Sequence, residues 1–221
     1  MKQDSLRKYV SEIIGTFALV FAGTGAIIVN DLSRGSLGHV GVALSFGLVI
    51  MVMIYALGDV SGAHFNPAVS FGFWAAGRFP AREMGLYAAC QIVGAFLASA
   101  MLRFIFLDHL TIGITTPGPG VSDLRAMCFE AVLTFFLMFV ILNVTHGAKE
   151  KGAFAGTAIG GTIALDALFG GPITGASMNP ARSLAPAILS NHLEGLWIYI
   201  VGPLAGAFAA SAVCRVIRDR H

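Results

Sequence analysis

Residues 61–70 read SGAHFNPAVS, and residues 174–183 read TGASMNPARS. Six of these ten positions are identical, and Ser61 and Thr174 are a near match. An Asn-Pro pair alone usually marks a turn. Here the pair occurs twice in matched contexts, and each time it opens an apolar segment about half as long as a membrane span. A repeat of this kind has to be considered before any other feature, because it organises the whole chain into two related halves.

Longer apolar runs surround the two short ones. A helix needs about 20 apolar residues to cross the hydrocarbon of a bilayer. The chain is 56% hydrophobic and only 12% charged, about half the charged share of a soluble domain. The sequence therefore predicts an all-α membrane protein with six transmembrane helices and two re-entrant half-helices. The predicted spans are 10–29, 40–57, 84–101 (extending toward 107), 126–144, 154–169 and 196–213, and the half-helices are 66–76 and 179–189.

The order of elements is the same in both halves. Glu12, Thr16 and Phe17 of the first span reappear as Glu130, Thr134 and Phe135 of the fourth. Each half holds three full spans, an odd number, so the second half must enter the membrane from the opposite face. Such inverted repeats place the functional site near the bilayer midplane, where the halves meet. We expect one domain over residues 1–221, with repeat one at 6–107 and repeat two at 124–216.

The Asn-Pro-Ala triplets have a specific physical role in this arrangement. Asn is a favoured N-cap and Pro a favoured first helical residue, so each triplet should begin a helix in mid-membrane. The Asn oxygen would cap the helix, both amide N–H groups would point into a lumen, and the facing positive helix ends would repel cations. The triplets are Asn66, Pro67 and Ala68, and Asn179, Pro180 and Ala181.

The residues before each Asn should be extended and should offer carbonyl oxygens to a pore. The residue before Pro disfavours helix, and non-helical backbone at membrane depth must be buried or line a watery cavity. The predicted pore loops are Gly62, Ala63, His64 and Phe65, and Gly175, Ala176, Ser177 and Met178.

Glu12 and Glu130 are costly inside a membrane and have two interpretations. One is a proton relay. The other is that each carboxylate accepts N–H bonds from a pore loop and holds it in place, since intramembrane charges are usually paired. Their matched positions favour the loop-supporting role.

Basic residues favour the cytoplasmic side of a membrane. Ten of the 14 fall on the side that holds both termini, which predicts cytoplasmic termini and an outward loop at 108–125. These ten are Lys2, Arg7, Lys8, Arg78, Arg82, Lys149, Lys151, Arg215, Arg218 and Arg220, whereas Arg34, Arg103 and Arg125 fall on or near the other side and Arg182 belongs to neither.

Several function classes find little support. A net charge of +2 does not suggest nucleic acid as a partner. The three cysteines have no CxxC spacing, so neither a metal site nor a disulfide framework is expected. No nucleophile–base pair supports an enzyme, and no cofactor is expected.

The motifs closely resemble the aquaporin, or major intrinsic protein, family over residues 6–216, on both triplets, their HFNPAVS and GASMNPARS contexts and the two repeat glutamates. The resemblance implies a homotetramer in the cell membrane (plasma or inner), with one pore per subunit. It also implies a narrow outer filter. Carried over by spacing from the triplets, the filter residues are Phe46, Ala167, Ala176 and Arg182.

The filter leaves the transported solute open. Strict water channels are similar to one another in having His where Ala167 stands, so two alanines predict a wider opening. The segment LDALFGGPITGASMNPARS resembles plant nodulin-like intrinsic proteins and their bacterial relatives, a branch associated with glycerol and with metalloid hydroxides such as arsenite. Ser183 and Ala187 instead resemble water channels. The expected function is a passive channel for water and small neutral solutes, with a strict water channel as the alternative.

Two residues beside the motifs have alternative interpretations. Asp166 adjoins the filter position and is either a charge at the outer vestibule or, as we favour, a hydrogen-bonded or water-exposed carboxylate. His64 either lines the cytoplasmic mouth or packs within its loop.

Inverted repeats also occur in secondary transporters, but those need ion-coupling carboxylates, and the buried ones here are better explained as structural. Saturation of flux and proton dependence would discriminate the two. A purely structural junction protein would not need Arg182 or two asparagines that face a lumen.

Overall fold

The structure is a computed structural model, and it describes residues 2–107, 109, 111–145 and 153–218. In this part of the chain all regular structure is helical. Asp108, Lys149, Lys151 and Arg220, which entered the predictions of loop and orientation, lie outside the described residues. The helices are α1 (Lys2–Leu32), α2 (Gly38–Ser61), α3 (Pro67–Ala75), α4 (Ala81–Ile105), α5 (Asp123–Val144), α7 (Ala155–Thr174), α8 (Pro180–Leu189) and α9 (Ile198–Arg218).

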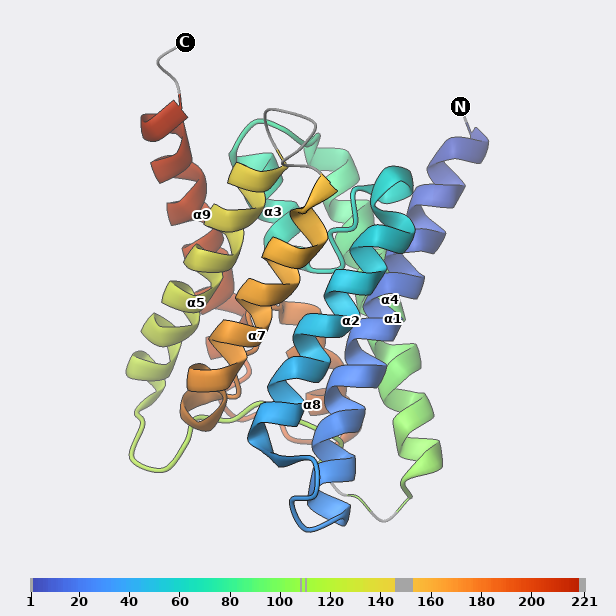
Figure 1. Ribbon diagram of the computed structural model, residues 1–221, viewed down its shortest axis with the longest axis vertical. Helices are drawn as coiled ribbons and strands as arrows, with labels where there is room; N and C mark the ends of the chain where they lie inside the picture. The colour runs from blue at the N-terminus through green and yellow to red at the C-terminus, as the bar shows by residue number, and fades with distance from the viewer. Residues whose placement is uncertain (1, 108, 110, 146–152, 219–221) are drawn as a thin grey trace.

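The six predicted spans correspond to α1, α2, α4, α5, α7 and α9, and the two half-helices to α3 and α8. Most of the long helices extend a few residues beyond the apolar runs, because polar residues at the membrane interface can remain helical. Five of the six are long and apolar enough to cross a membrane by themselves. The sixth, α7, has 20 residues but contains Asp166, Pro172 and several glycines, and it runs alongside α2 (Figure 1).

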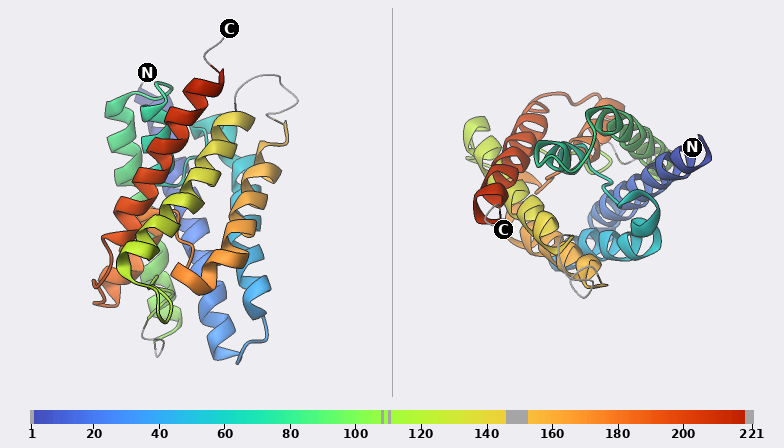
Figure 2. Two further views of the ribbon diagram at one scale, coloured as in Figure 1. Left: turned by 90° about the vertical axis from the view of Figure 1, so that its left-hand side faces the viewer. Right: turned by 90° about the horizontal axis from the view of Figure 1, so that it is seen from above.

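The two halves are related by inversion. In Figure 1 both termini lie at the upper end, with α3 in the upper half of the molecule and α8 in the lower half. The helix packing is also the same in both halves, because the first long helix of each contacts the second and third: α1 packs on α2 and α4, and α5 packs on α7 and α9. Each half-helix also contacts the third long helix of the other repeat, α3 on α9 and α8 on α4. Seen from above, α3 lies between α9 and α4, and α5, α7, α2 and α1 form the rest of the ring of long helices (Figure 2).

Matched glycines end the helices that precede the two pore loops. Gly62 and Gly175 both have φ 84° and ψ −2°, and each donates its N–H to the carbonyl four residues earlier, Gly58 or Gly171. A left-handed residue after a helix is the usual way to satisfy its last carbonyls. Identical caps at both sites therefore send the two loops into the membrane interior with the same geometry.

Glycines also allow the long helices to approach one another closely. A methyl group at Gly47 of α2 would lie 2.5 Å from the Gly160 oxygen of α7, and one at Gly160 would lie 2.5 Å from the Gly47 oxygen. Methyl groups at Gly94 and Gly206 would overlap backbone oxygens of α1 and α5. Small residues at helix crossings are typical of membrane proteins, where close packing replaces the hydrophobic effect between helices.

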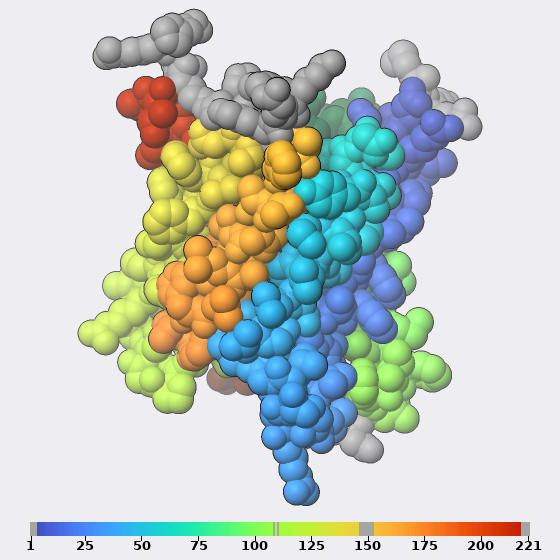
Figure 3. Space-filling view, viewed as in Figure 1, coloured from blue at the N-terminus to red at the C-terminus, as the bar shows by residue number. Residues whose placement is uncertain are grey.

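The outer surface of the molecule is apolar. Large side chains such as Leu44, Leu48, Val93, Val132 and Phe136 are exposed, whereas many polar side chains are buried inside. Figure 3 shows α2, α7 and α5 side by side on one such face. This distribution suits a lipid environment, in which apolar surface is solvated and backbone polar groups must be satisfied within the protein.

Candidate pore and filter

The two half-helices begin at the predicted asparagines. The Asn66 side-chain oxygen accepts a hydrogen bond from the Ala68 N–H at 2.8 Å. The Asn179 oxygen accepts from the N–H groups of Ala181 at 3.0 Å and Arg182 at 3.3 Å. Proline occupies the first turn of both helices, where its missing N–H costs nothing.

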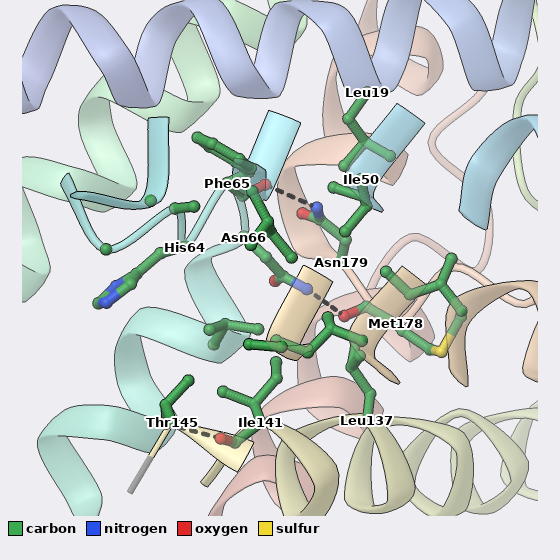
Figure 4. A pocket seen from close by; sticks show the side chains of 18 of the residues that line it. Leu19, Ile50, His64, Phe65, Asn66, Leu137, Ile141, Thr145, Met178 and Asn179 are labelled. Atoms are coloured by element: carbon green, nitrogen blue, oxygen red, sulfur yellow. Dashed lines mark hydrogen bonds between the residues drawn. The ribbon is translucent and has the colours of Figure 1, made fainter. Parts of the chain in front are cut away.

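The amide nitrogens of the two asparagines tie the halves together. Asn66 Nδ2 donates to the Met178 oxygen at 2.7 Å, and Asn179 Nδ2 donates to the Phe65 oxygen at 3.0 Å (Figure 4). The expectation that both N–H groups of each amide face the lumen is therefore wrong. One N–H per amide is used across the midplane, which leaves one per amide for the cavity.

The pore loops are non-helical, but they are not extended as expected. Ala63, Phe65, Ala176 and Met178 all have positive φ, between 42° and 53°. Proline restricts only the residue directly before it, and Asn66 is indeed extended at φ −156°. Left-handed conformations of non-glycine residues are strained and persist only where the surroundings hold them.

Glu12 holds the first loop in its strained conformation. It is fully buried, and its carboxylate accepts backbone N–H groups at 3.0 Å and 2.8 Å. Two side chains also donate to it at 2.7 Å each. The four donors are the N–H groups of His64 and Phe65, the Ser61 hydroxyl and the Gln91 amide.

Glu130 has the same arrangement in the second half. It accepts the N–H groups of Ser177 at 2.9 Å and Met178 at 2.8 Å, and the Thr174 hydroxyl at 2.7 Å. These contacts are those expected of a loop-supporting carboxylate. Gln91, which gives Glu12 a fourth donor, was not singled out in the sequence, because a glutamine in an apolar helix carries no motif that marks it.

A cavity of about 690 Å³ runs through the contact between the halves. It is lined by residues of both loops, both asparagines and all four predicted filter positions. Gly175, the Pro-Ala pairs of both triplets and the two glutamates do not line it. The predicted residues on its wall are Phe46, Gly62, Ala63, His64, Phe65, Asn66, Ala167, Ala176, Ser177, Met178, Asn179 and Arg182.

The opposite wall of the cavity is apolar and was not singled out in the sequence. It includes Leu19 and Leu137, which occupy matching positions in the two repeats, and likewise Ile50 and Ile163. Figure 4 shows Leu19, Ile50 and Leu137 directed toward the paired asparagines. The cavity therefore has polar groups along the loops and apolar side chains facing the paired asparagines, and further polar side chains, Tyr55, Asp59, Arg78 and Thr145, also line it.

The filter arginine is held at one side of the cavity. Arg182 is only 2% exposed, and its Nη1 donates to the Gly113 oxygen at 2.7 Å. Its guanidinium carbon lies 5.2 Å from the centroid of the Phe46 ring, within range of a cation–π contact. Its Nε has no hydrogen-bond partner in the described part of the chain. Gly113 was missed because it lies in an irregular loop 69 residues away in the sequence.

His64 both packs in its loop and lines the cavity. Its Nδ1 lies 3.0 Å from the Ser70 hydroxyl, and its ring stacks on Phe73 at 4.6 Å between centroids. It is 9% exposed. The two interpretations of this residue are thus compatible.

Asp166 differs from what we favoured. It is neither water-exposed nor hydrogen-bonded at Oδ2: it is 2% exposed, and that oxygen has no partner in the described residues. It does not line the cavity either, although its neighbour Ala167 does. Asp166 and Ala167 are adjacent on α7, but only Ala167 reaches the cavity wall. The alternative interpretation, in which Asp166 places a charge at the outer vestibule, is therefore not supported either.

A comparison of the sequence with models of protein families finds a match over nearly the whole chain. The model of the major intrinsic protein family matches residues 1–214. The chain belongs to this family. Membership makes it a multi-pass membrane channel rather than an enzyme.

Individual members of the major intrinsic protein family support the same assignment. Aquaporin NIP1-1 of Oryza sativa subsp. japonica is 46% identical over 218 residues, which covers 96% of this chain and 75% of the relative. Nodulin-26 of Glycine max is 44% identical over 214 residues and covers 96% of this chain and 78% of the relative. The predicted similarity to nodulin-like intrinsic proteins is thereby confirmed.

A solved member of the family has the same fold. The X-ray structure of the aquaglyceroporin from Plasmodium falciparum matches with a TM-score of 0.87 at 26% identity, and it covers 97% of this chain and 98% of that one. The prediction of six spans and two half-helices is confirmed by this agreement and by the helices of the structure itself.

Proposed function

We propose that this protein is a passive channel that conducts water together with glycerol, metalloid hydroxides such as arsenite, or both, and excludes ions and protons. One observation carries the proposal: a single cavity is lined by both asparagines and by all four filter positions, from both halves of the chain. Relatives named aquaporin and a solved aquaglyceroporin support it.

The width of the filter favours solutes larger than water. Ala167 and Ala176, whose side chains are only methyl groups, line the cavity together with Phe46 and Arg182. A hydroxylated solute needs hydrogen-bond partners, because desolvating a hydroxyl without one costs several kcal/mol. Arg182 brings guanidinium N–H donors to the cavity wall, and the pore loops on the same wall contribute backbone carbonyl oxygens as acceptors. A neutral solute with several hydroxyls fits such a lining.

Ions meet an unfavourable potential at two places. The N-termini of α3 and α8 face each other across the midplane, and each carries roughly half a positive charge. Arg182 adds a full positive charge at the filter. In aquaporin-type pores generally, arginine and half-helix dipoles exclude protons and cations, and we assign the same role to these groups here.

We infer the orientation of the channel in the membrane from the distribution of its basic residues. Arg7, Lys8, Arg78, Arg82 and Arg215 belong to the end that holds both termini, which supports cytoplasmic termini in the cell membrane. The two repeats, 6–107 and 124–216, would form one channel domain, because each half-helix packs on the other repeat. Assembly as a homotetramer with one pore per subunit completes the proposal.

Reconstitution into liposomes tests the proposed function. Water, glycerol and arsenite fluxes would be measured side by side on the same vesicles, against vesicles without protein. We expect fast water flux and flux of at least one of the two solutes, without saturation and without dependence on a proton gradient. Flux of water alone would favour a strict water channel, whereas saturable, proton-dependent flux would favour a secondary transporter.

A further inference from the structure

A short segment between α4 and α5 contacts the filter arginine at the end of the molecule opposite the chain termini (Figure 1). We call residues 109 and 111–115 the strap. Its Gly113 oxygen accepts the hydrogen bond from Arg182 at 2.7 Å, and its Thr115 hydroxyl donates to the Ser183 hydroxyl at 2.8 Å. The Ser190 hydroxyl at the end of α8 donates to the Thr111 oxygen at 3.2 Å. The position of the arginine thus depends on the position of the strap.

The strap is set into a slot between α1 and α4. Ile112 is fully buried and packs with Ile28 of α1 and Leu102 of α4. Its φ is 37°, which is rare for a β-branched residue. At Gly113, a methyl group would lie 2.7 Å from Thr24. Such a strained backbone persists only when its surroundings over-determine it, and strain of this kind gathers at functional sites.

The His109 side chain bridges the strained backbone at Ile112 and the end of α1. The Ile112 N–H donates to His109 Nδ1 at 3.2 Å, so that nitrogen is the acceptor and Nε2 carries the ring hydrogen. Nε2 lies 3.3 Å from Asp31 Oδ2, at the end of α1. Arg103 of α4 donates to the His109 backbone oxygen at 3.0 Å. A single side chain therefore connects α1 to the residue that precedes Gly113.

We propose that Asp31 and His109 are positioning residues for the filter: together they keep the strap in its slot, and the strap keeps the Gly113 carbonyl on the Arg182 guanidinium. The inference rests on the proposed function, because it assumes that Arg182 selects among solutes. When the pair is broken, the strain at Ile112 is no longer held and the arginine loses its fixed acceptor. A freed guanidinium no longer presents its donors to a hydroxylated solute, so glycerol passage falls more than water passage.

The test compares glycerol and water permeabilities of reconstituted variants. His109→Ala removes both contacts, and Asp31→Ala removes one. Each should lower the ratio of glycerol to water permeability by about threefold, the effect of losing about one neutral hydrogen bond from the barrier. Asp31→Asn still accepts from Nε2–H and should keep the wild-type ratio. His192→Ala, a change at another histidine near the same end, is the matched control and should also keep it.

Rescue by the conservative variant separates positioning from a general loss of structure. Asp31→Asn keeps an acceptor for the His109 Nε2–H and should retain the wild-type ratio of glycerol to water permeability, whereas Asp31→Ala should not. Equal ratios in all variants would overturn the inference while leaving the channel function intact. A wild type that carries no solute other than water would refute the proposed solute range, and with it this inference, which rests on that range.

Discussion

At the scale of single residues, the two pore loops have the same backbone and different side chains. Val69 stands in the first repeat where Arg182 stands in the second. Both residues line the cavity, but Val69 is apolar and packs in the hydrophobic core, whereas Arg182 hydrogen-bonds to Gly113 and contacts the Phe46 ring. An inverted pair of loops can thus give one filter rather than two, because only one of them carries a charge.

Ala167 determines the width of the filter in our interpretation. Ala167→His should fill the space beside Arg182 and cut glycerol and arsenite flux at least tenfold, a barrier increase of roughly 1.4 kcal/mol. Water flux should change much less. Ala167→Val fills the space without a polar group and so separates size from polarity. Liposome flux assays check both variants, and undiminished glycerol flux in Ala167→His would place the constriction elsewhere.

Arg182 should be the main barrier to protons. In Arg182→Val the filter would resemble the first repeat, and we expect a measurable proton or small-cation conductance while water still passes. Arg125→Val, at an exposed arginine in the first turn of α5, is the control and should conduct no protons. Conductance can be followed with a pH-sensitive dye inside liposomes. If Arg182→Val conducts no protons, the dipoles of α3 and α8 are enough to exclude protons without the arginine.

Asp166 carries a buried oxygen without a partner in the described residues. Burying a neutral amide costs less than burying a carboxylate, so Asp166→Asn should stabilise the protein by about 1–2 kcal/mol, or a few degrees in the thermal midpoint for a chain of this size. Asp123→Asn, at an exposed carboxylate in the first turn of α5, should leave the midpoint unchanged or lower it slightly. A lower midpoint for Asp166→Asn would show that the carboxylate has a binding partner.

At the scale of elements, α7 continues through a proline next to the filter. Pro172 has no N–H to give to the Leu168 oxygen one turn earlier. His39, at the start of α2, takes its place, with Nε2 2.7 Å from that oxygen. A methyl group at Gly171 would lie 2.5 Å from the His39 ring, so the small residue is needed for this contact. The helix that carries Ala167 is thus completed by a side chain from the other repeat.

We expect this contact to stabilise the end of α7. His39→Ala leaves the Leu168 oxygen without its donor and should lower the free energy of unfolding by about 0.5–1.5 kcal/mol. His39→Gln retains an N–H donor and should recover most of the loss. Thermal melts of the purified protein in detergent measure both changes. Equal melting of His39→Ala and wild type would mean that lipid or water satisfies the carbonyl.

At the scale of the whole molecule, the halves are joined at three levels. α2 crosses α7 at reciprocal glycines, Gly47 and Gly160. The half-helices pack on the long helices of the other repeat, and the two asparagines exchange hydrogen bonds at the midplane. Neither half alone encloses the cavity, because its walls come from both.

The orientation of the whole molecule can be tested by cysteine labelling. Thr115 is buried and bonded to Ser183, so the exposed Thr116 beside it is the better position. A membrane-impermeant maleimide should label Thr116→Cys in intact cells. Arg82→Cys, exposed at the start of α4, should react only after permeabilisation. The reverse pattern would place the termini outside. Wild type serves as the background for the three native cysteines.

The sequence by itself determined the features that depend on neighbouring residues. Asn and Pro begin α3 and α8 because capping acts within one turn. Apolar runs indicated the six long helices because crossing a bilayer requires length and hydrophobicity. The repeat gave the inversion by counting spans, and it paired Glu12 with Glu130 as supports of the loops.

Only the tertiary structure decided what depends on residues far apart in the chain. The bonds of Asn66 to Met178 and of Asn179 to Phe65 join positions 112 and 114 residues apart. The carbonyl that holds Arg182 comes from a loop 69 residues away. The left-handed loops also could not be predicted, because their conformation is locally unfavourable and exists only where buried carboxylates accept the N–H groups it presents.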